Sequence, residues 1–389
     1  MTDPALSGAV VVGACQTPYS KQPVKEAPEL LIDVIVGILR DSGIQLRHVD
    51  GLAVTSFQLP PDNVVTLAER LGASPAWAWQ GAHGGASGVM GVIEAARAVT
   101  DGRASTVVVA GGDSYDVSRH MSLMDEFNTG MRDYLAPYAF GGTNGLFALV
   151  EREHRELYGT KRTQLAKLAV TQRSNAELNP NALLRSPMTE EDYLTARLIA
   201  DPIRLYDCVL PCTGADAVLV MSRERADELG LAGISILSGR AQNNYLPLEP
   251  LSLRTGAERF APQLFEDARL AHADLDFVQL YDDYPIMEVI QLEDLGFADK
   301  GGGGPFVEAT DISRQGTLPV NTGGGQLSCG QSGAGGGVIG LVEAVLQLLG
   351  RAGDRQLDSP RLGLVSGFGM VGYGKGLSSA AVILSCEPQ

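Results

Sequence analysis

Two segments of the chain share one order of features, and this repeat constrains the fold more than any other feature. Residues 84–114 read GGASGVMGVIEAARAVTDGRASTVVVAGGDS, and residues 333–370 read GAGGGVIGLVEAVLQLLGRAGDRQLDSPRLGLVSGFGM. Each runs from a glycine turn into an apolar helix that reaches Glu-Ala, then into a strand followed by glycines. Such self-similarity indicates an internal duplication. The sequence therefore predicts two related α/β halves, with two glycine-turn helices, starting near Ser87 and Gly335, buried side by side.

Strands and helices alternate through the first part of the chain, as expected for an α/β core. Apolar, β-branched runs predict strands over 9–18, 49–57 and 104–116, the last breaking at Gly111–Gly112, and helical periodicity predicts helices over 28–44 and 63–72. Residues 115–200 are rich in Met, Tyr, Asn and charge, and they predict a mostly helical insertion that covers a site. We therefore assign 1–114 plus 201–225 to the N-terminal half, 115–200 to the insertion and 226–389 to the C-terminal half.

Composition excludes several classes of partner. The 389 residues are 44% hydrophobic, which allows a large core, and their net charge of −16 argues against nucleic acid or an anionic membrane surface. No run of about 18 apolar residues occurs, so no membrane span is expected. The 5 cysteines are irregularly spaced, which fits a reducing cytoplasm and predicts neither disulfides nor a metal site.

The first glycine turn, from His83 to Ser87, lies where an acyl-transfer enzyme would hold its nucleophile. Backbone N–H groups at the start of a helix stabilise a thiolate or an oxyanion. The turn contains no cysteine, and its serine has no base nearby in the sequence. The motif therefore has the form of a catalytic turn without its nucleophile.

Five segments resemble, in their order and spacing, the thiolase superfamily, and specifically the sterol-carrier-protein-type thiolases and lipid-transfer thiolase-like proteins. They are VVVGACQTPYSK, GGASG, DPIRLYDCVLPCTGADAVLVMS, DFVQLYDDYPIMEVIQLEDLGF and PVNTGGGQLSCGQSGAGGGVIGLVEAVLQL. The resemblance implies a duplicated fold of five layers (αβαβα), with a mixed five-stranded sheet in each half around two central helices. It also implies a homodimer and coenzyme A thioester substrates, with coenzyme A as part of the substrate and no separate cofactor.

The chain departs from the thiolase pattern at each catalytic motif. Gly85 stands where a thiolase has its nucleophilic cysteine, and residues 281–284, Tyr-Asp-Asp-Tyr, replace the family's Asn-Glu-Ala-Phe or His-Asp-Cys-Phe. Residues 330–332, Gly-Gln-Ser, replace Gly-His-Pro. In the C-terminal turn SGFGMVGYGKG, Met370 or Gly367 lies nearest the missing second cysteine. Without the thiol no acyl-enzyme forms, so the usual two-step thiolysis or condensation is unavailable.

Aldol chemistry beside a thioester needs no covalent intermediate, only an oxyanion hole and an acid or base on the β-hydroxyl. The chain is similar to the steroid side-chain-cleaving aldolases of this superfamily, which lack the cysteine and carry a tyrosine at the position of Tyr281. That branch has a second tyrosine where this chain has Gln331, which can donate a hydrogen bond but cannot exchange a proton. Proton transfer then falls to Tyr281, Asp283 or His83, with Tyr373 as a second candidate acid.

Each candidate also has a structural interpretation. Tyr281 and Tyr284 could be packing residues at a strand end, and Asp282 or Asp283 could cap the helix that starts at Pro285. Cys329 is expected to be a small buried residue, with a nucleophilic role as the alternative. His83 could be an exposed spacer. The remaining histidines lie in polar stretches, and we expect them to be solvated; they are His48, His120, His154 and His272.

Three functions remain open from the sequence. The first is a coenzyme A-thioester aldolase or retro-aldolase that shortens a steroid or other bulky side chain. The second is a non-catalytic thiolase-like subunit that binds acyl-coenzyme A or supports a partner, and the third is an acyltransferase using Cys329. The resemblance further implies a small partner with an OB-fold and a zinc ribbon, giving a heterotetramer. The polar turn at Tyr281–Asp283 favours an enzyme, because a dead site would tend to lose costly buried polar groups.

Overall fold

A computed structural model describes residues 5–140, 142–249, 251–372 and 374–386. Its strands form one nine-stranded sheet in the order β3-β2-β4-β7-β1-β8-β11-β10-β9, with β5 and β6 as a separate pair. The strands are β1 (Ala9–Gln16), β2 (Gly51–Thr55), β3 (Trp77–Gly81), β4 (Thr106–Ser114), β5 (Leu198–Ala200), β6 (Ile203–Arg204), β7 (Thr213–Ser222), β8 (Ile234–Asn243), β9 (Phe277–Gln279), β10 (Leu362–Gly372) and β11 (Lys375–Ser385).

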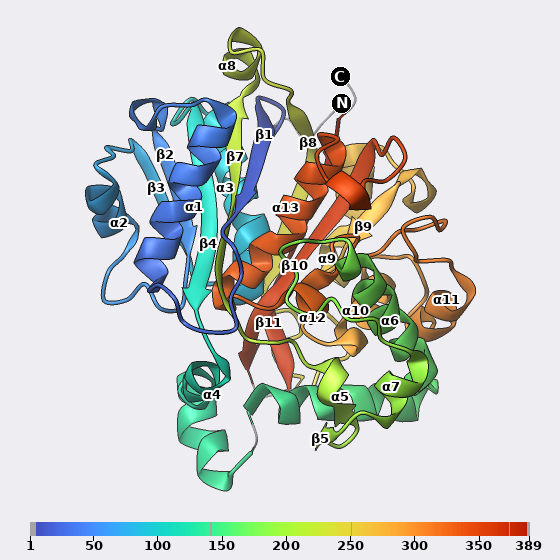
Figure 1. The fold of residues 1–389 in the computed structure, drawn as a ribbon. Coiled ribbons are helices and arrows are strands. Elements are labelled where there is room, and N and C mark those ends of the chain that lie inside the picture. The colour runs from blue at the N-terminus through green and yellow to red at the C-terminus, as the bar shows by residue number, and fades with distance from the viewer. Residues whose placement is uncertain (1–4, 141, 250, 373, 387–389) are drawn as a thin grey trace.

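Thirteen α-helices occur in these described ranges, and Figure 1 places them around the sheet. They are α1 (Ala27–Ser42), α2 (Val64–Leu71), α3 (Ser87–Thr100), α4 (Val117–Asp125), α5 (Gly142–Tyr158), α6 (Arg162–Glu177), α7 (Glu190–Thr195), α8 (Arg223–Glu228), α9 (Ala257–Ala268), α10 (Pro285–Asp294), α11 (Gly303–Ala309), α12 (Gly325–Cys329) and α13 (Gly336–Leu348). No helix within those ranges is long and apolar enough to cross a bilayer.

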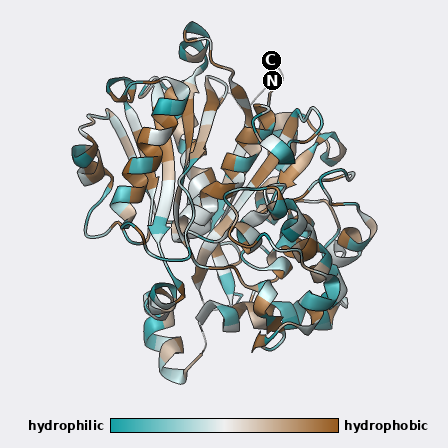
Figure 2. Ribbon diagram, in the orientation of Figure 1, coloured by the Kyte–Doolittle hydropathy of each residue, from teal (hydrophilic) through white to brown (hydrophobic). Residues whose placement is uncertain are grey.

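The elements stack in five layers, as the resemblance to the thiolase superfamily implies. Helix α1 packs on the outer face of β1, β4 and β7, and α9 packs on the outer face of β8 and β11. Between them, α3 and α13 contact each other and strands of both halves. Figure 2 shows hydrophobic residues concentrated on these strands and central helices. The aliphatic side chains of α3 and α13 share one buried cluster with strands of both halves, so the core lies between the two parts of the sheet.

Glycine allows the two central helices to approach closely. A Cβ atom on Gly88 would lie 2.1 Å from the carbonyl oxygen of Gly337, and a Cβ on Gly337 would lie 2.3 Å from the carbonyl oxygen of Gly85. Any side chain at these positions would collide with backbone, which cannot move out of the way as a flexible side chain can. The predicted adjacency of the two glycine-turn helices is confirmed.

The sheet differs from the expected pair of five-stranded sheets. The N-terminal half supplies five strands, and the C-terminal half supplies four, joined to them where β8 pairs with β1. Within the described residues, β9 pairs with β10 and, at an isolated bridge between Val278 and Val320, with one further segment. Asn321, the next residue, has a left-handed backbone conformation with φ of 48°, which differs from that of a strand.

One strand of the N-terminal half was predicted with a wrong end, and another strand was not predicted at all. Strand β4 does not break at Gly111–Gly112 but continues to Ser114, because β7 pairs with it along its whole length. The edge strand β3 has the sequence WAWQG and lacks the β-branched run that signals a strand.

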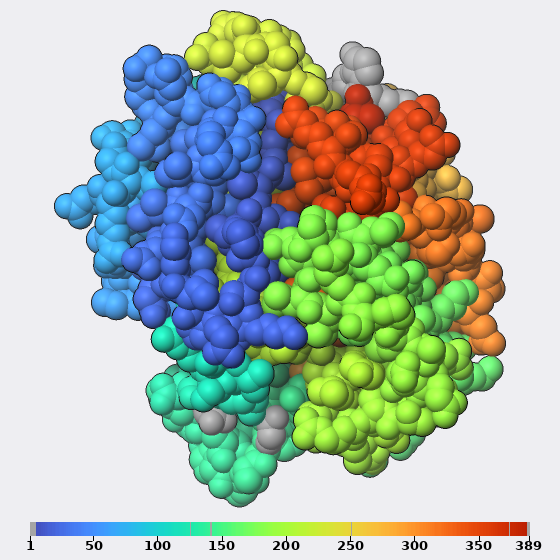
Figure 3. Space-filling model, in the orientation of Figure 1, coloured from blue at the N-terminus to red at the C-terminus, as the bar shows by residue number. Residues whose placement is uncertain are grey.

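Residues 115–200 contain α4, α5, α6 and α7, in line with a mostly helical segment. Figure 3 shows the green part of this segment lying against the blue N-terminal residues and the red C-terminal residues. The exact boundaries assigned to the two halves and the insertion stay predictions.

Candidate active site at the glycine turns

A cavity of about 410 Å³ lies beside the first glycine turn. Its wall brings together segments that are far apart in the sequence, including Gly84–Gly85, the turn before α10, the start of the second glycine turn and the end of β10. Three of the predicted site residues line it: Tyr281, Asp283 and Gln331. The rest of the wall is mostly apolar and includes Phe57, Val117, Met121, Met124, Phe127, Phe147, Leu184, Ile199, Leu205, Leu210, Met370 and Val371.

Hydrogen bonds of its backbone groups fix Tyr281 in the turn between β9 and α10. Its N–H donates to Ser366 Oγ at 3.1 Å, and its carbonyl accepts from Gln291 Nε2 at 2.7 Å. Ser366 in turn donates to Gln291 Oε1 at 2.7 Å, so strand β10 and helix α10 fix the turn together. The phenol oxygen is then left for the cavity, where Gln331 Nε2 donates to it over 3.4 Å. The structure thus places Tyr281 next to Gln331.

The ring of Tyr281 occupies the space that a side chain on residue 85 would need. A Cβ atom on Gly85 would lie 2.1 Å from both Cε2 and Cζ of that ring, and 2.4 Å from the carbonyl oxygen of Phe368. Contacts this short do not occur between unbonded atoms, so ring and side chain exclude each other. The absence of a nucleophilic side chain at residue 85 and the position of the Tyr281 ring therefore depend on each other. The sequence alone does not show this relation.

Asp282 has a structural role, although not the one considered from the sequence. Its carboxylate accepts from the backbone N–H groups of Gln326 at 2.9 Å and Leu327 at 3.1 Å, in the first turn of α12. It therefore caps α12, whereas α10, which follows it directly, starts at Pro285 without a side-chain cap. Burial raises the pKa of Asp282 to about 7.

Asp283 is the unsatisfied acid of the site. It is 8% exposed and lines the cavity, and its Oδ1 is buried with no hydrogen-bond partner in the described part of the chain. Burial, and then the neighbouring charge of Asp282, raise the pKa of this carboxyl well above its usual range. A buried polar atom without a partner is costly, and such groups concentrate at functional sites.

Burial, Asp283 and Asp282, in that order, raise the pKa of Tyr281 above its ordinary value near 10. The phenol therefore stays protonated at neutral pH and acts as a hydrogen-bond donor. A carboxyl with a raised pKa beside a neutral phenol forms a pair in which the carboxylate accepts a proton and the tyrosine donates a hydrogen bond.

Gln331 is positioned by its backbone at the start of the second glycine turn. Its N–H donates to the carbonyl of Leu210 at 2.8 Å, and its carbonyl accepts from Cys212 N–H at 2.9 Å. This pairing leaves the side-chain amide to face Tyr281. An amide N–H fixed in this way is suited to hold a developing oxyanion.

The structure does not bring the other two candidates to this cluster. Among the described residues that line the cavity, His83 is not found; its ring stacks on Trp79 with centroids 6.2 Å apart, and burial lowers its pKa. Tyr373 lies outside the described residues. The catalytic roles of all five candidates stay predictions.

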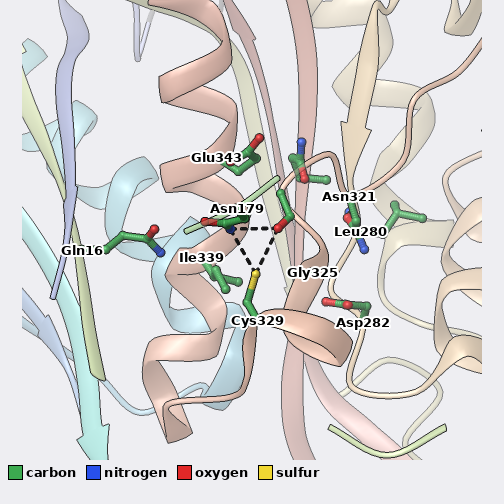
Figure 4. A pocket seen from close by; sticks show the side chains of 12 residues that line it. Gln16, Asn179, Leu280, Asp282, Asn321, Gly325, Cys329, Ile339 and Glu343 are labelled. Carbon is green, nitrogen blue, oxygen red and sulfur yellow. Dashed lines mark hydrogen bonds between the residues drawn. The ribbon is translucent and has the colours of Figure 1, made fainter. Parts of the chain in front are cut away.

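Cys329 lies away from the large cavity, beside a small one of about 20 Å³ that shares no lining residue with it. Its sulfur accepts a hydrogen bond from the amide of Asn179 at 3.3 Å, as Figure 4 shows. The thiol also donates to the carbonyl oxygen of Gly323 at 3.1 Å. The residue is 3% exposed, and burial raises its thiol pKa. A protonated thiol without access to substrate is a poor nucleophile, which agrees with the expected small buried residue.

Sequence reasoning missed a second thiol, because nothing in the sequence around Cys208 marks it as a site residue. Cys208 lines the large cavity and contacts Asn144 Oδ1 at 3.5 Å. Burial, followed by the charge of Asp207, raises its pKa to about 12, so it carries no thiolate at neutral pH.

Two histidines were wrongly expected to be solvated. His154 is fully buried in α5, with Nδ1 2.8 Å from Thr160 Oγ1 and Nε2 3.2 Å from Glu293 Oε2. His120 lines the large cavity from α4. Their polar sequence neighbours hid this placement, although the spacing of Val117, His120 and Met121 is that of one helix face.

Comparison with known proteins agrees with the layered fold. A family described as thiolase C-terminal domain-like matches residues 242–385. The 17-hydroxy-3-oxo-4-pregnene-20-carboxyl-CoA lyase of Mycobacterium tuberculosis is 30% identical over 89% of this chain and 92% of its own. An acetyl-CoA acetyltransferase of Methanothermobacter thermautotrophicus is 26% identical over 94% of this chain and 97% of its own.

Among solved structures, one described as the Ltp2-ChsH2(DUF35) aldolase superposes with a TM-score of 0.83 at 25% identity, covering 97% of this chain and 98% of that chain. The duplicated glycine-turn helices, the five layers and the extent of these matches lead to one conclusion: the chain belongs to the thiolase superfamily.

Proposed function

We propose that the chain is a coenzyme A-thioester aldolase that works in the retro-aldol direction on a bulky β-hydroxyacyl group. The observation that carries the proposal is the pair formed by Asp283, whose Oδ1 has no hydrogen-bond partner among the described residues, and the neutral phenol of Tyr281. This pair lines a cavity whose nucleophile position is filled by the tyrosine ring. The names of the lyase and aldolase relatives support it.

In this reaction the ionised carboxylate of Asp283 takes the proton of the substrate β-hydroxyl, with the hydroxyl of Tyr281 as hydrogen-bond donor or relay. The Cα–Cβ bond then breaks, and its electron pair becomes the enolate of the thioester. The former β-carbon leaves as a ketone or aldehyde. The amide of Gln331 stabilises the enolate oxygen, and the proton held by Asp283 returns to Cα, which releases the shortened acyl-coenzyme A.

We further propose that the substrate has a steroid or similarly bulky side chain, since large apolar residues line most of the cavity. A homodimer and an OB-fold partner with a zinc ribbon, forming a heterotetramer, belong to the same proposal. A neighbouring structure whose title names two components, Ltp2 and ChsH2(DUF35), supports the partner.

The acyltransferase alternative has one supporting observation, the acetyl-CoA acetyltransferase relative. The positions and pKa values of two thiols argue against it. Cys329 is buried away from the cavity, and the raised pKa of Cys208, which lines the cavity, keeps that thiol protonated. A non-catalytic acyl-coenzyme A-binding subunit is the other alternative, and it predicts no cleavage at all.

The test is Tyr281→Phe, assayed for cleavage of a bulky β-hydroxyacyl-coenzyme A in the presence and absence of an OB-fold partner. The change removes only the hydroxyl, so we expect kcat to fall by about 10² while the melting temperature barely changes. Tyr245→Phe is the matched control, because it removes a hydroxyl that donates to Glu258 Oε2 at 2.7 Å outside the cavity. Wild-type rates in Tyr281→Phe would contradict the role of Tyr281. A wild-type chain inactive under both conditions would favour the non-catalytic subunit.

A further inference from the structure

Helix α4 presents an imidazole to the cavity within a stripe of apolar side chains. Val117, His120, Met121 and Met124 all line the cavity, at the spacing of one helix face. The helix begins with Asp116, whose side chain accepts from Arg119 N–H at 2.8 Å. This cap fixes the start of α4 and hence the face that it turns to the cavity.

The ring of His120 is held by packing rather than by hydrogen bonds. It meets the ring of Tyr115 edge-on, with centroids 5.7 Å apart and an interplanar angle of 90°. Its Nδ1 is buried and has no hydrogen-bond partner in the described residues. Burial lowers its pKa to about 4, so the imidazole is neutral at physiological pH.

A neutral imidazole carries one N–H, and the surroundings decide which nitrogen holds it. A hydrogen on Nδ1 would be a buried donor with no acceptor, and such orphaned N–H groups are rarer than under-satisfied acceptors. The hydrogen therefore belongs on Nε2. That nitrogen is then free to donate to a molecule in the cavity.

We propose that His120 is a specificity-determining residue, which donates a hydrogen bond to an oxygen carried by the acyl group away from its thioester. The inference rests on the proposed function. It narrows the proposed substrates to bulky, largely apolar acyl-coenzyme A thioesters that bear a ketone or hydroxyl oxygen. An all-hydrocarbon acyl group would give the His120 donor no partner in this mostly apolar cavity. A site built to pair a polar group rejects the ligand that lacks it for this reason.

Binding of uncleavable ligands tests this separately from catalysis. We would titrate calorimetrically three acyl-coenzyme A thioesters that lack the β-hydroxyl and share one ring system, with a distal ketone, a distal hydroxyl or only hydrogen. We expect wild type to bind one or both oxygenated ligands about tenfold more tightly than the hydrocarbon, with the favoured ligand identifying the oxygen. His120→Phe keeps an aromatic ring against Tyr115, and it should reduce the preference to less than about twofold.

His48→Phe, which alters an exposed histidine, should keep the full preference. His120→Gln, which returns an N–H donor, should restore part of it even if the phenylalanine variant folds poorly. Equal binding of all three ligands by wild type, or an undiminished preference in His120→Phe, would overturn the proposal. If the wild-type chain shows this binding preference but cleaves no substrate, the aldolase reaction is rejected and the role of His120 is retained.

Discussion

Substituting Gly85 tests whether the tyrosine ring has replaced the nucleophile in space. In Gly85→Ala the new Cβ meets two ring atoms of Tyr281 at 2.1 Å and the Phe368 carbonyl oxygen at 2.4 Å. Ordinary van der Waals contact begins at 3.4 Å, so both neighbours must move by about 1 Å. The ring of Tyr281 can tilt toward the cavity. The carbonyl of Phe368 cannot move as easily, because it belongs to strand β10, which pairs with β11 along its length.

Overpacking of this kind lowers the free energy of unfolding by about 1–3 kcal/mol. Because one of the contacts is with backbone, we expect the loss in Gly85→Ala to lie toward the upper end of that range. We expect a lower melting temperature by calorimetry and a loss of cleavage activity, since Tyr281 leaves its place beside Gln331. Gly85→Cys should behave alike and gain no thiolase activity. Gly340→Ala is the matched control, because its Cβ on helix α13 would meet only side chains, at 3.3 Å and 3.4 Å. If Gly85→Ala melted and cleaved as wild type does, the steric argument would be refuted.

Three further changes probe the acid and the thiols. Ionisation of Asp283 is opposed in the folded state, so kcat should rise with pH above the usual carboxyl range, while the unfolding free energy falls as pH rises through the raised pKa. Asp283→Asn should remove the rise of kcat in pH-rate profiles and weaken the pH dependence of the unfolding free energy in denaturant titrations, where Asp282 still titrates. Cys329→Ala should retain most of its cleavage activity. Its free energy of unfolding, measured with urea, should fall by about 1 kcal/mol because Asn179 loses a hydrogen-bond partner. A hundredfold loss of activity in a folded variant would favour the acyltransferase function again. Cys208→Ala should keep most of the wild-type cleavage rate, and a hundredfold loss in a folded variant would contradict the absence of a thiol nucleophile.

The adjacency of the two central helices could be predicted because glycine patterns mark close approach of backbones, whereas the five layers came from the family resemblance. Gly88 and Gly337 are needed where α3 and α13 cross, and the repeat placed both at the starts of helices. Strand pairing was harder to foresee. The extension of β4 through Gly112 depends on its partner Ala215 in β7, which lies about a hundred residues further along the chain.

Three of the five candidate site residues could be assigned to one cavity from the sequence, but their arrangement could not be predicted. Motif position identified Tyr281, Asp283 and Gln331, and the structure places all three on one cavity. The collision between residue 85 and the Tyr281 ring depends on distances across the two halves. The role of Asp282 depends on the tertiary position of α12, so local sequence suggested the wrong helix for its cap. His120 was missed because a lone histidine in a polar stretch gives no sign of the face that it occupies.

The central claim is that the chain breaks a carbon–carbon bond without forming an acyl-enzyme. Product formation from a bulky β-hydroxyacyl-coenzyme A, measured against added free coenzyme A and paired with the intact mass of the protein during turnover, tests it most directly. The account predicts a ketone or aldehyde and a shortened acyl-coenzyme A in equal amounts, at a rate independent of free coenzyme A, with no mass added to the chain. Cleavage that requires free coenzyme A, or a protein mass increased by one acyl group, would contradict it.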